Sequence, residues 1–264
     1  MTLILTMNGL TYIYFSATST TSKCAKAIGK ATGLPVNREI NIADNHATEL
    51  PFFESDDVAI IAAPVYSGRL PQPAVDTIKR LKGKGASVIA IVVYGNRDYD
   101  DALLELTDML KKTGFNIIGA GAFIGQHSIF PKVGTNRPDK SDLAVLAEFG
   151  KACRKRLDAG KPYDDIETKG NNPYKKPMSV PLHPKCDSHN CNRCSECAIK
   201  CPVGAIDKDN PVETDTAKCI SCGRCIYVCP RNARNYSGIK YTLIGKVFIS
   251  SYSKRKEPEW KVAD

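Results

Sequence analysis

Long hydrophobic runs are missing from this sequence. No stretch of its 264 residues approaches the roughly 18 consecutive apolar residues that a membrane-spanning helix needs. Residues 1–7 contain no Lys or Arg, so the basic start of a secretory signal peptide is absent as well. We therefore expect a cytoplasmic protein with no membrane partner.

Nucleotide-binding loops are also missing. No GxxxxGK[ST] run is present, and Gly119, Gly121 and Gly125 have the wrong spacing for a dinucleotide loop. These glycines also fall within an expected strand, and no βαβ unit of the kind that a dinucleotide loop opens follows them. We expect no ATP or nicotinamide site in this chain.

Cysteine is abundant, and eight of the 11 cysteines form two runs of identical spacing, 28 residues apart. The runs are Cys191, Cys194, Cys197, Cys201 and Cys219, Cys222, Cys225, Cys229, each followed by proline. This spacing is the ligand run of bacterial two-cluster ferredoxins, in which the fourth cysteine ligates the other run's cluster. We therefore expect two [4Fe–4S] clusters. One is held by Cys191, Cys194, Cys197 and Cys229, and the other by Cys219, Cys222, Cys225 and Cys201.

Zinc ligation and a disulfide framework are the two alternatives for these cysteines. Zinc sites usually pair two Cys-x2-Cys knuckles across a longer spacer, and disulfide frameworks belong to small secreted domains. Neither explains a complete motif that occurs twice. Cys24 and Cys153 are expected in the core, while Cys186 is either a packed or free thiol or an accessory ligand.

The N-terminal half alternates apolar runs with helical stretches. We expect strands at 10–15, 36–42, 58–63, 86–94 and 115–124. Helices are expected from about 23 and at 74–82, 100–112 and 141–158. This alternation predicts an α/β fold with a doubly wound, five-stranded parallel sheet of order 2-1-3-4-5. In such sheets the ligand lies beyond the carboxyl ends of strands one and three.

Hydroxyl side chains gather at that position, in Ser16, Thr18, Ser19, Thr20 and Thr21. A loop that leads into a helix N-terminus offers backbone N–H groups and the positive end of the helix dipole to an anion. Helix capping alone would explain two of these residues. The whole cluster indicates a phosphate site.

The loops around this site resemble those of flavodoxins. Residues 16–21 resemble the flavodoxin phosphate loop Ser/Thr-x-Thr-Gly-x-Thr, with Ser19 in place of the usual glycine. The resemblance implies FMN, with the loops at 63–71 and 94–100 against the two faces of the flavin. It further implies that Tyr99 stacks on the ring and that Asp100 lies near its polar edge. From the residues alone, Tyr66 and Tyr99 could each be ordinary surface tyrosines.

The FMN-binding candidates come from these three loops. They are Ser16, Thr18, Ser19, Thr20, Thr21, Pro64, Val65, Tyr66, Ser67, Gly68, Tyr94, Gly95, Asn96, Arg97, Tyr99 and Asp100. Arg69 and Arg97 stand in the flanking loops, and a positive charge near the ring would raise the flavin potential. A structural role is expected for His127, with proton donation near the flavin as the alternative.

The order of the two parts resembles a family of flavodoxin–ferredoxin fusions from anaerobic bacteria and archaea. We divide the chain into an FMN-binding domain (1–160), a proline-rich linker (161–185), a small α+β two-cluster ferredoxin domain (186–236) and a C-terminal tail (237–264). The tail is β-prone at 239–249 and is expected to pack back on the body, with 254–260 at the surface.

The formal charge of +9 does not indicate a nucleic-acid partner. From Lys169 onward 17 Lys and Arg stand against 9 Asp and Glu. Two cubes of about −2 each and a flavin phosphate of about −2 would offset most of the total.

The resemblance implies an electron-transfer module with a redox protein as donor or acceptor, and electrons passing from clusters to FMN. The alternative is an FMN-dependent reductase of a small molecule.

Overall fold

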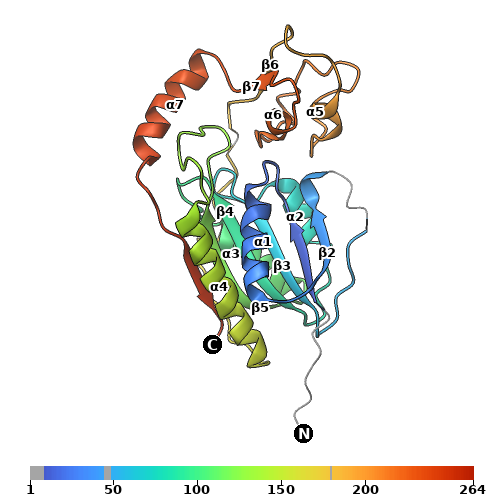
Figure 1. The fold of residues 1–264 in the computed structure, drawn as a ribbon, viewed down its shortest axis with the longest axis vertical. Helices are drawn as coiled ribbons and strands as arrows, with labels where there is room; N and C mark the ends of the chain where they lie inside the picture. The colour runs from blue at the N-terminus through green and yellow to red at the C-terminus, as the bar shows by residue number, and fades with distance from the viewer. Residues whose placement is uncertain (1–8, 45–48, 179) are drawn as a thin grey trace.

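A computed structural model describes residues 9–44, 49–178 and 180–264 (Figure 1). The expectation about a signal peptide at residues 1–7 lies outside this part. The main sheet consists of β1 (Leu10–Tyr14), β2 (Val36–Asn41), β3 (Val58–Pro64), β4 (Ser87–Tyr94), β5 (Asn116–Ile124) and β8 (Glu259–Val262). The strands lie in the order β2-β1-β3-β4-β5-β8, and the first five are parallel. The predicted doubly wound order 2-1-3-4-5 is confirmed.

Helices cover both faces of this sheet. One face packs on α1 (Thr20–Thr32) and α4 (Lys140–Asp158), and the other on α2 (Gln72–Ile78) and α3 (Ala102–Lys112). Side chains of a strand alternate between the two faces of the sheet, and β1 carries apolar side chains on both. Tyr12 packs on the side of α1 and α4, and Ile13 packs on the side of α2 and α3. Burial on both faces explains why the strands read as continuous apolar runs. A short 3-10 helix, η1 (Ile42–Asp44), follows β2.

The tail packs back on the body as expected, but its strand is not where the sequence placed it. β8 pairs antiparallel with the edge strand β5, with Gly121 opposite Trp260. The indole ring lies 5.3 Å from the Phe149 ring of α4. Residues 254–257 and Glu259 are exposed, as predicted, whereas Trp260 is half-buried, and β8 gives the sheet a sixth strand. A glycine in β5 leaves the space that the Trp260 side chain needs.

Residues 239–249 are β-prone but form most of a helix, α7 (Ile239–Tyr252). Tyr241, Ile244 and Phe248 recur at helical spacing and pack with Phe130. The Phe130 ring lies 5.3 Å from Tyr241 and 5.0 Å from Phe248. Tertiary packing thus overrides the local β preference. Among the described residues, no helix combines the length and apolar character needed to cross a membrane.

The cysteine-rich part forms a small α+β unit at the carboxyl ends of the main strands (Figure 1). It contains β6 (Lys185–Cys186), α5 (Glu196–Ile199), α6 (Arg224–Tyr227) and β7 (Arg234–Asn235). β6 and β7 form a two-stranded antiparallel sheet. This architecture agrees with the small α+β fold that the sequence predicts.

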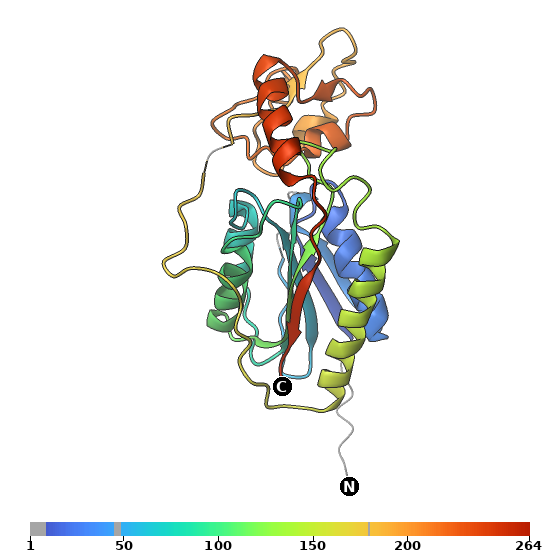
Figure 2. The same ribbon diagram turned by 90° about the vertical axis from the view of Figure 1, so that its left-hand side faces the viewer.

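The connector between the two parts runs along the outside of α3 (Figure 2). Its described residues before β6 contain no helix or strand. The Asp101 carboxylate accepts hydrogen bonds from the backbone N–H groups of Asn171 at 2.8 Å and Lys175 at 2.6 Å. The Tyr174 hydroxyl donates to Asp108. The proline-rich segment is thus fastened to the first domain.

Candidate functional site

The two cysteine runs fold into two small hollows. The first hollow is lined by Cys191, Cys194, Cys197 and Cys229, together with Cys186. The second hollow is lined by Cys201, Cys219, Cys222 and Cys225. The fourth cysteine of each run therefore stands with the first three of the other run, which is the arrangement that crosswise ligation of two clusters requires.

The sequence duplication is repeated in the backbone. The N–H of Ala205 donates to Cys201 Sγ and the N–H of Ala233 donates to Cys229 Sγ, both across 3.3 Å. Ser195 and Gly223 occupy equivalent left-handed positions before α5 and α6, with φ of 59° and 76°. These donors would stabilise thiolate sulfur at equivalent positions of both hollows.

The hollows differ in exposure. Cys194 is exposed and Cys191 half-buried, whereas Cys222 and Cys225 are buried. Burial raises the pKa of Cys222 and of Cys225 to about 12. Thiolates so placed need a cationic partner, and a cluster's iron ions supply one. Four run cysteines line each hollow, and a set of four thiolates fits a [4Fe–4S] group.

A cavity of about 460 Å³ lies at the carboxyl ends of β1, β3, β4 and β5. We call it the central cavity. The candidates that line it are Thr18, Thr20, Thr21, Pro64, Val65, Tyr66, Ser67, Gly68, Tyr94, Gly95 and Arg97. Three separate loops thus bring most of the predicted FMN-binding residues to one space, at the switch point of the sheet.

Five candidates do not line the central cavity, and the largest correction concerns Tyr99. Its side chain is 3% exposed, and its hydroxyl donates to Glu259 of β8 at 2.7 Å. Lys169 of the connector lies 5.0 Å from the ring centroid. Tyr99 therefore packs between β8 and the connector, which leaves Tyr66 and Tyr94 as the aromatic candidates at the cavity.

The other four form local contacts. Ser16 Oγ accepts from the backbone N–H of Ser22 at 3.1 Å, and Ser19 Oγ donates to the Tyr227 hydroxyl at 2.8 Å. Asn96 is buried and donates to the backbone oxygens of Tyr252 and Lys254. Asp100 forms an ion pair with Arg97. These residues shape the loops and do not face the space between them.

The two arginines of the flanking loops have different surroundings. Arg69 does not line the central cavity. Its Nε and Nη2 donate bidentate hydrogen bonds to the two carboxylate oxygens of Glu105 at 2.8 and 2.7 Å. Arg97 does line the cavity, and its ion pair with Asp100 offsets part of its charge. Of the two arginines, only Arg97 is therefore placed where its charge could raise the potential of a flavin in the central cavity.

The sequence predicted only part of the far wall of the central cavity, namely the loop that contains His127. This wall is lined by Gln126, His127, Ser128, Ile129 and Phe130 after β5, by Met178, Val180, Pro181 and Leu182 of the connector, and by Ile244, Phe248 and Tyr252 of α7. Only the long loop after β5 carried a signal, because its length is unusual for a compact domain. The connector and α7 reach the site through tertiary packing.

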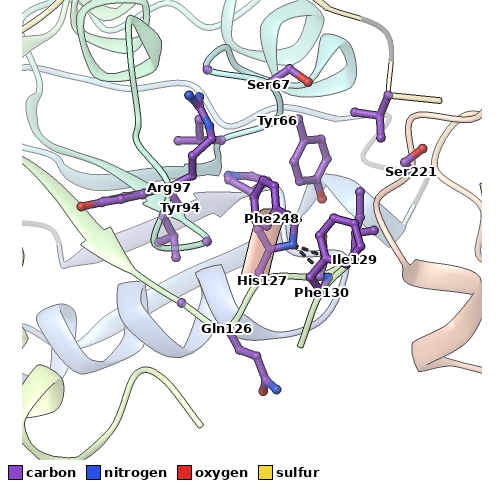
Figure 3. Close-up of a pocket in the computed structure, with 18 of the residues that line it drawn as sticks. Tyr66, Ser67, Tyr94, Arg97, Gln126, His127, Ile129, Phe130, Ser221 and Phe248 are labelled. Atoms are coloured by element: carbon purple, nitrogen blue, oxygen red, sulfur yellow. Dashed lines mark hydrogen bonds between the residues drawn. The ribbon is translucent and has the colours of Figure 1, made fainter. Parts of the chain in front are cut away.

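His127 is held in one orientation in this wall (Figure 3). Its Nδ1 accepts from the backbone N–H groups of Ile129 at 3.2 Å and Phe130 at 3.1 Å. Its ring lies 4.7 Å from that of Phe248. Burial lowers the pKa of His127 to about 4, with a smaller contribution from Arg97. The ring is therefore neutral near pH 7, with its hydrogen on Nε2.

The second hollow adjoins the central cavity, whereas the first does not. Ile220 lines both the second hollow and the central cavity, and Ser221 enters the cavity beside it (Figure 3). Cys222 packs in the same apolar cluster as Tyr66. Arg224 Nη1 donates to the backbone oxygen of Ala17 in the hydroxyl-rich loop at 3.2 Å. No described residue is shared between the first hollow and the cavity.

Known proteins resemble the C-terminal part in sequence. Residues 190–233 match the family model of the 4Fe-4S dicluster domain. A stretch of 49 residues is 37% identical to the ferredoxin-type protein NapH of Escherichia coli (strain K12), covering 16% of this chain. The chain spans only 17% of NapH. The C-terminal part is therefore an iron–sulfur domain of the 4Fe-4S dicluster type.

Solved structures resemble the N-terminal part. Rubredoxin oxygen:oxidoreductase from Desulfovibrio gigas aligns with a TM-score of 0.43 and 16% identity, over 57% of this chain and 36% of its own. A flavodoxin from the domain Archaea aligns with a TM-score of 0.41 and 14% identity, over 56% of this chain and 98% of its own. Flavodoxin 1 from Bacillus cereus aligns with a TM-score of 0.41 and 17% identity, over 55% of this chain and 97% of its own. The strand order of the first five strands, 2-1-3-4-5, is itself that of a flavodoxin-like sheet. A flavodoxin-like sheet followed by a dicluster domain fits the flavodoxin–ferredoxin fusions that the motifs resemble.

Proposed function

We propose that this protein transfers electrons between two [4Fe–4S] clusters and one FMN, with the first hollow as the entry site and FMN as the sink. The observation that carries this proposal is the wall shared by the second hollow and the central cavity at Ile220. A cluster in the first hollow stands near the surface at Cys194, where a redox protein can approach. A cluster in the second hollow stands between that surface and the flavin site.

The hydroxyl-rich loop supports FMN as the ligand of the central cavity. Thr18, Thr20 and Thr21 surround the N-terminus of α1, whose first turn contains no acidic residue. Backbone N–H groups at a helix N-terminus, with hydroxyl donors beside them, suit a terminal phosphate. The opposite part of the cavity is aromatic and apolar, with Tyr66, Tyr94 and Phe248 in its lining, and suits a flat ring system.

The chain's own residues would orient the flavin and exclude water from it. Bound FMN would supply the ability to exchange electrons singly or in pairs. Phe130 and Phe248 cover the cavity on the side of α7, and Ser221 approaches from the dicluster domain. The neutral His127 offers a hydrogen-bond donor at Nε2 in the same wall.

The alternative is an FMN-dependent reductase that uses its own dicluster domain as the electron source. The long loop after β5 and helix α7 favour it, because they could act as a lid over a second ligand. The cavity of about 460 Å³ must first hold FMN itself, and this favours the electron-transfer function.

Cofactor analysis and turnover assays test the proposal. Protein reconstituted under anaerobic conditions should contain about eight iron, about eight sulfide and one FMN per chain. Zinc in place of iron, or a lack of flavin binding, would overturn the assignment. Rapid steady turnover of a small organic acceptor, with no transfer to any redox protein, would establish the reductase alternative instead.

A further inference from the structure

Two arginine side chains have an unusual environment. Among the buried side-chain nitrogen and oxygen atoms of the described residues, Arg224 Nε and Arg234 Nε are the two without a hydrogen-bond partner. Arg234 is 2% exposed and Arg224 8%. Leaving a charged donor buried and unpaired is costly, and native structures rarely do so. An acceptor for each Nε–H is therefore missing from the protein atoms.

The remaining nitrogens of both guanidinium groups are fixed by the protein. Arg224 donates to Ala17 O at 3.2 Å and pairs with Asp44. Arg234 donates to Thr214 Oγ1 at 2.7 Å and to the backbone oxygens of Pro211 and Glu213. These contacts hold both side chains in place, so the unpaired Nε atoms cannot turn toward solvent without breaking them.

Each of these arginines lines one of the cysteine hollows. Arg224 lines the second hollow and Arg234 the first. The hydrogen bonds that Arg234 forms go to one hydroxyl and two backbone oxygens, and none of these acceptors is charged. A [4Fe–4S] group with four thiolates carries about −2 when oxidised, so it would provide the missing acceptor for both arginines and a counter-charge for Arg234.

We infer that Arg224 and Arg234 each donate an Nε–H hydrogen bond to the cluster of their own hollow and thereby set its reduction potential. The inference rests on the proposed function, because it requires clusters in the hollows. The acceptor is a sulfur atom of the cluster or of a ligating cysteine. Reduction adds one electron and one negative charge to the cluster, so a positive donor stabilises the reduced form and raises the potential. Arg224 also binds the hydroxyl-rich loop, so it links the second cluster to the flavin domain.

Potentials measured by EPR-monitored redox potentiometry test this inference. Arg224→Lys and Arg234→Lys keep the positive charge but remove the Nε–H. We expect each to disfavour reduction of one cluster about tenfold, equivalent to about 59 mV for one electron, and to leave the other cluster unchanged. Spectra of Cys201→Ser and Cys229→Ser proteins identify which signal belongs to which hollow. Arg231→Lys is the matched control, because Arg231 lines the first hollow but is exposed.

A second measurement uses the native protein, so it does not require that the variants fold. In native protein labelled with 15N-arginine, pulsed EPR of the reduced clusters should detect a 15N coupling at each cluster. Unchanged potentials in both lysine variants, or no 15N coupling in the native protein, would overturn the inference. If iron analysis shows no clusters, the proposed function itself fails, and the two failures are thereby distinguished.

Discussion

The hydroxyl of Ser19 donates a hydrogen bond to the hydroxyl of Tyr227 across 2.8 Å. Ser19 belongs to the loop before α1, and Tyr227 ends the short helix α6 that also contains Cys225. With the bond from Arg224 to Ala17 O, this contact attaches the dicluster domain directly to the loop that we expect to bind phosphate. The spacing between the second hollow and the central cavity is therefore set by direct contact and does not depend on the connector alone.

Cys201→Ser should destroy the cluster of the second hollow, although Cys201 belongs to the first run. The iron content should fall from about eight to about four, because one sulfur ligand of that group is lost. EPR of the reduced protein should match Cys219→Ser, while Cys229→Ser should match Cys191→Ser. Cys153→Ala is the control, since Cys153 is buried in the sheet core. Matching spectra of Cys201→Ser and Cys191→Ser would contradict the crosswise arrangement.

Thr18→Asp should weaken FMN binding on the order of 100-fold or more, because a carboxylate would stand against the phosphate. Thr18 lines the central cavity at the N-terminus of α1. Fluorescence titration of the flavin-free protein measures the affinity. Thr216→Asp, which places the same charge on an exposed loop of the dicluster domain, should have no effect. Equal affinity of the native protein for riboflavin and FMN would rule out a phosphate site.

Arg97→Gln should lower the flavin potential by tens of millivolts. One unit charge at ~8 Å contributes about 2 kcal/mol at an effective dielectric near 20, and partial exposure reduces this. Spectroelectrochemistry of the holoprotein measures the shift, and both cluster potentials should stay nearly constant. Arg97→Lys keeps the charge and should restore most of the potential. An unchanged potential in Arg97→Gln would remove this residue from the tuning of the flavin.

Acid should destabilise the folded protein through His127. Its pKa of about 4 lies below the ordinary value of 6.5, so between these values the unfolded chain binds a proton that the folded chain excludes. The free energy of unfolding should fall by about 2 kcal/mol from pH 7.5 to pH 5 on account of this residue. Anaerobic urea unfolding of native protein and His127→Gln measures the difference, with exposed His189→Gln as control. The same pH dependence in all three proteins would contradict the buried neutral state.

The sheet and the cysteine groups could be predicted because local signals determine them. Apolar runs buried on both faces identify parallel strands, and a duplicated ligand spacing identifies which cysteines share a hollow. The positions of Thr18, Tyr66 and Tyr94 at the cavity follow from the rule that ligands lie at the carboxyl ends of the strands.

The C-terminal part of the site could not be predicted because distant partners determine it. Tyr99 turns away from the cavity because Glu259, 160 residues later, accepts its hydroxyl hydrogen. The β-prone segment of α7 becomes helical because Phe130 offers an aromatic surface to Tyr241 and Phe248. Glu259 and Phe130 each lie more than 100 residues away in the sequence from the side chains they contact, so local sequence patterns cannot reveal these contacts.

Reduction of the holoprotein by a one-electron pulse tests the central claim most directly. A pulse that reduces the clusters should be followed by reduction of FMN, seen in its absorbance, with a first-order rate constant that is independent of protein concentration. In Cys201→Ser this phase should disappear while the remaining cluster is still reduced. A rate constant that rises with protein concentration, or no transfer to FMN in the native protein, would contradict electron transfer through the second hollow.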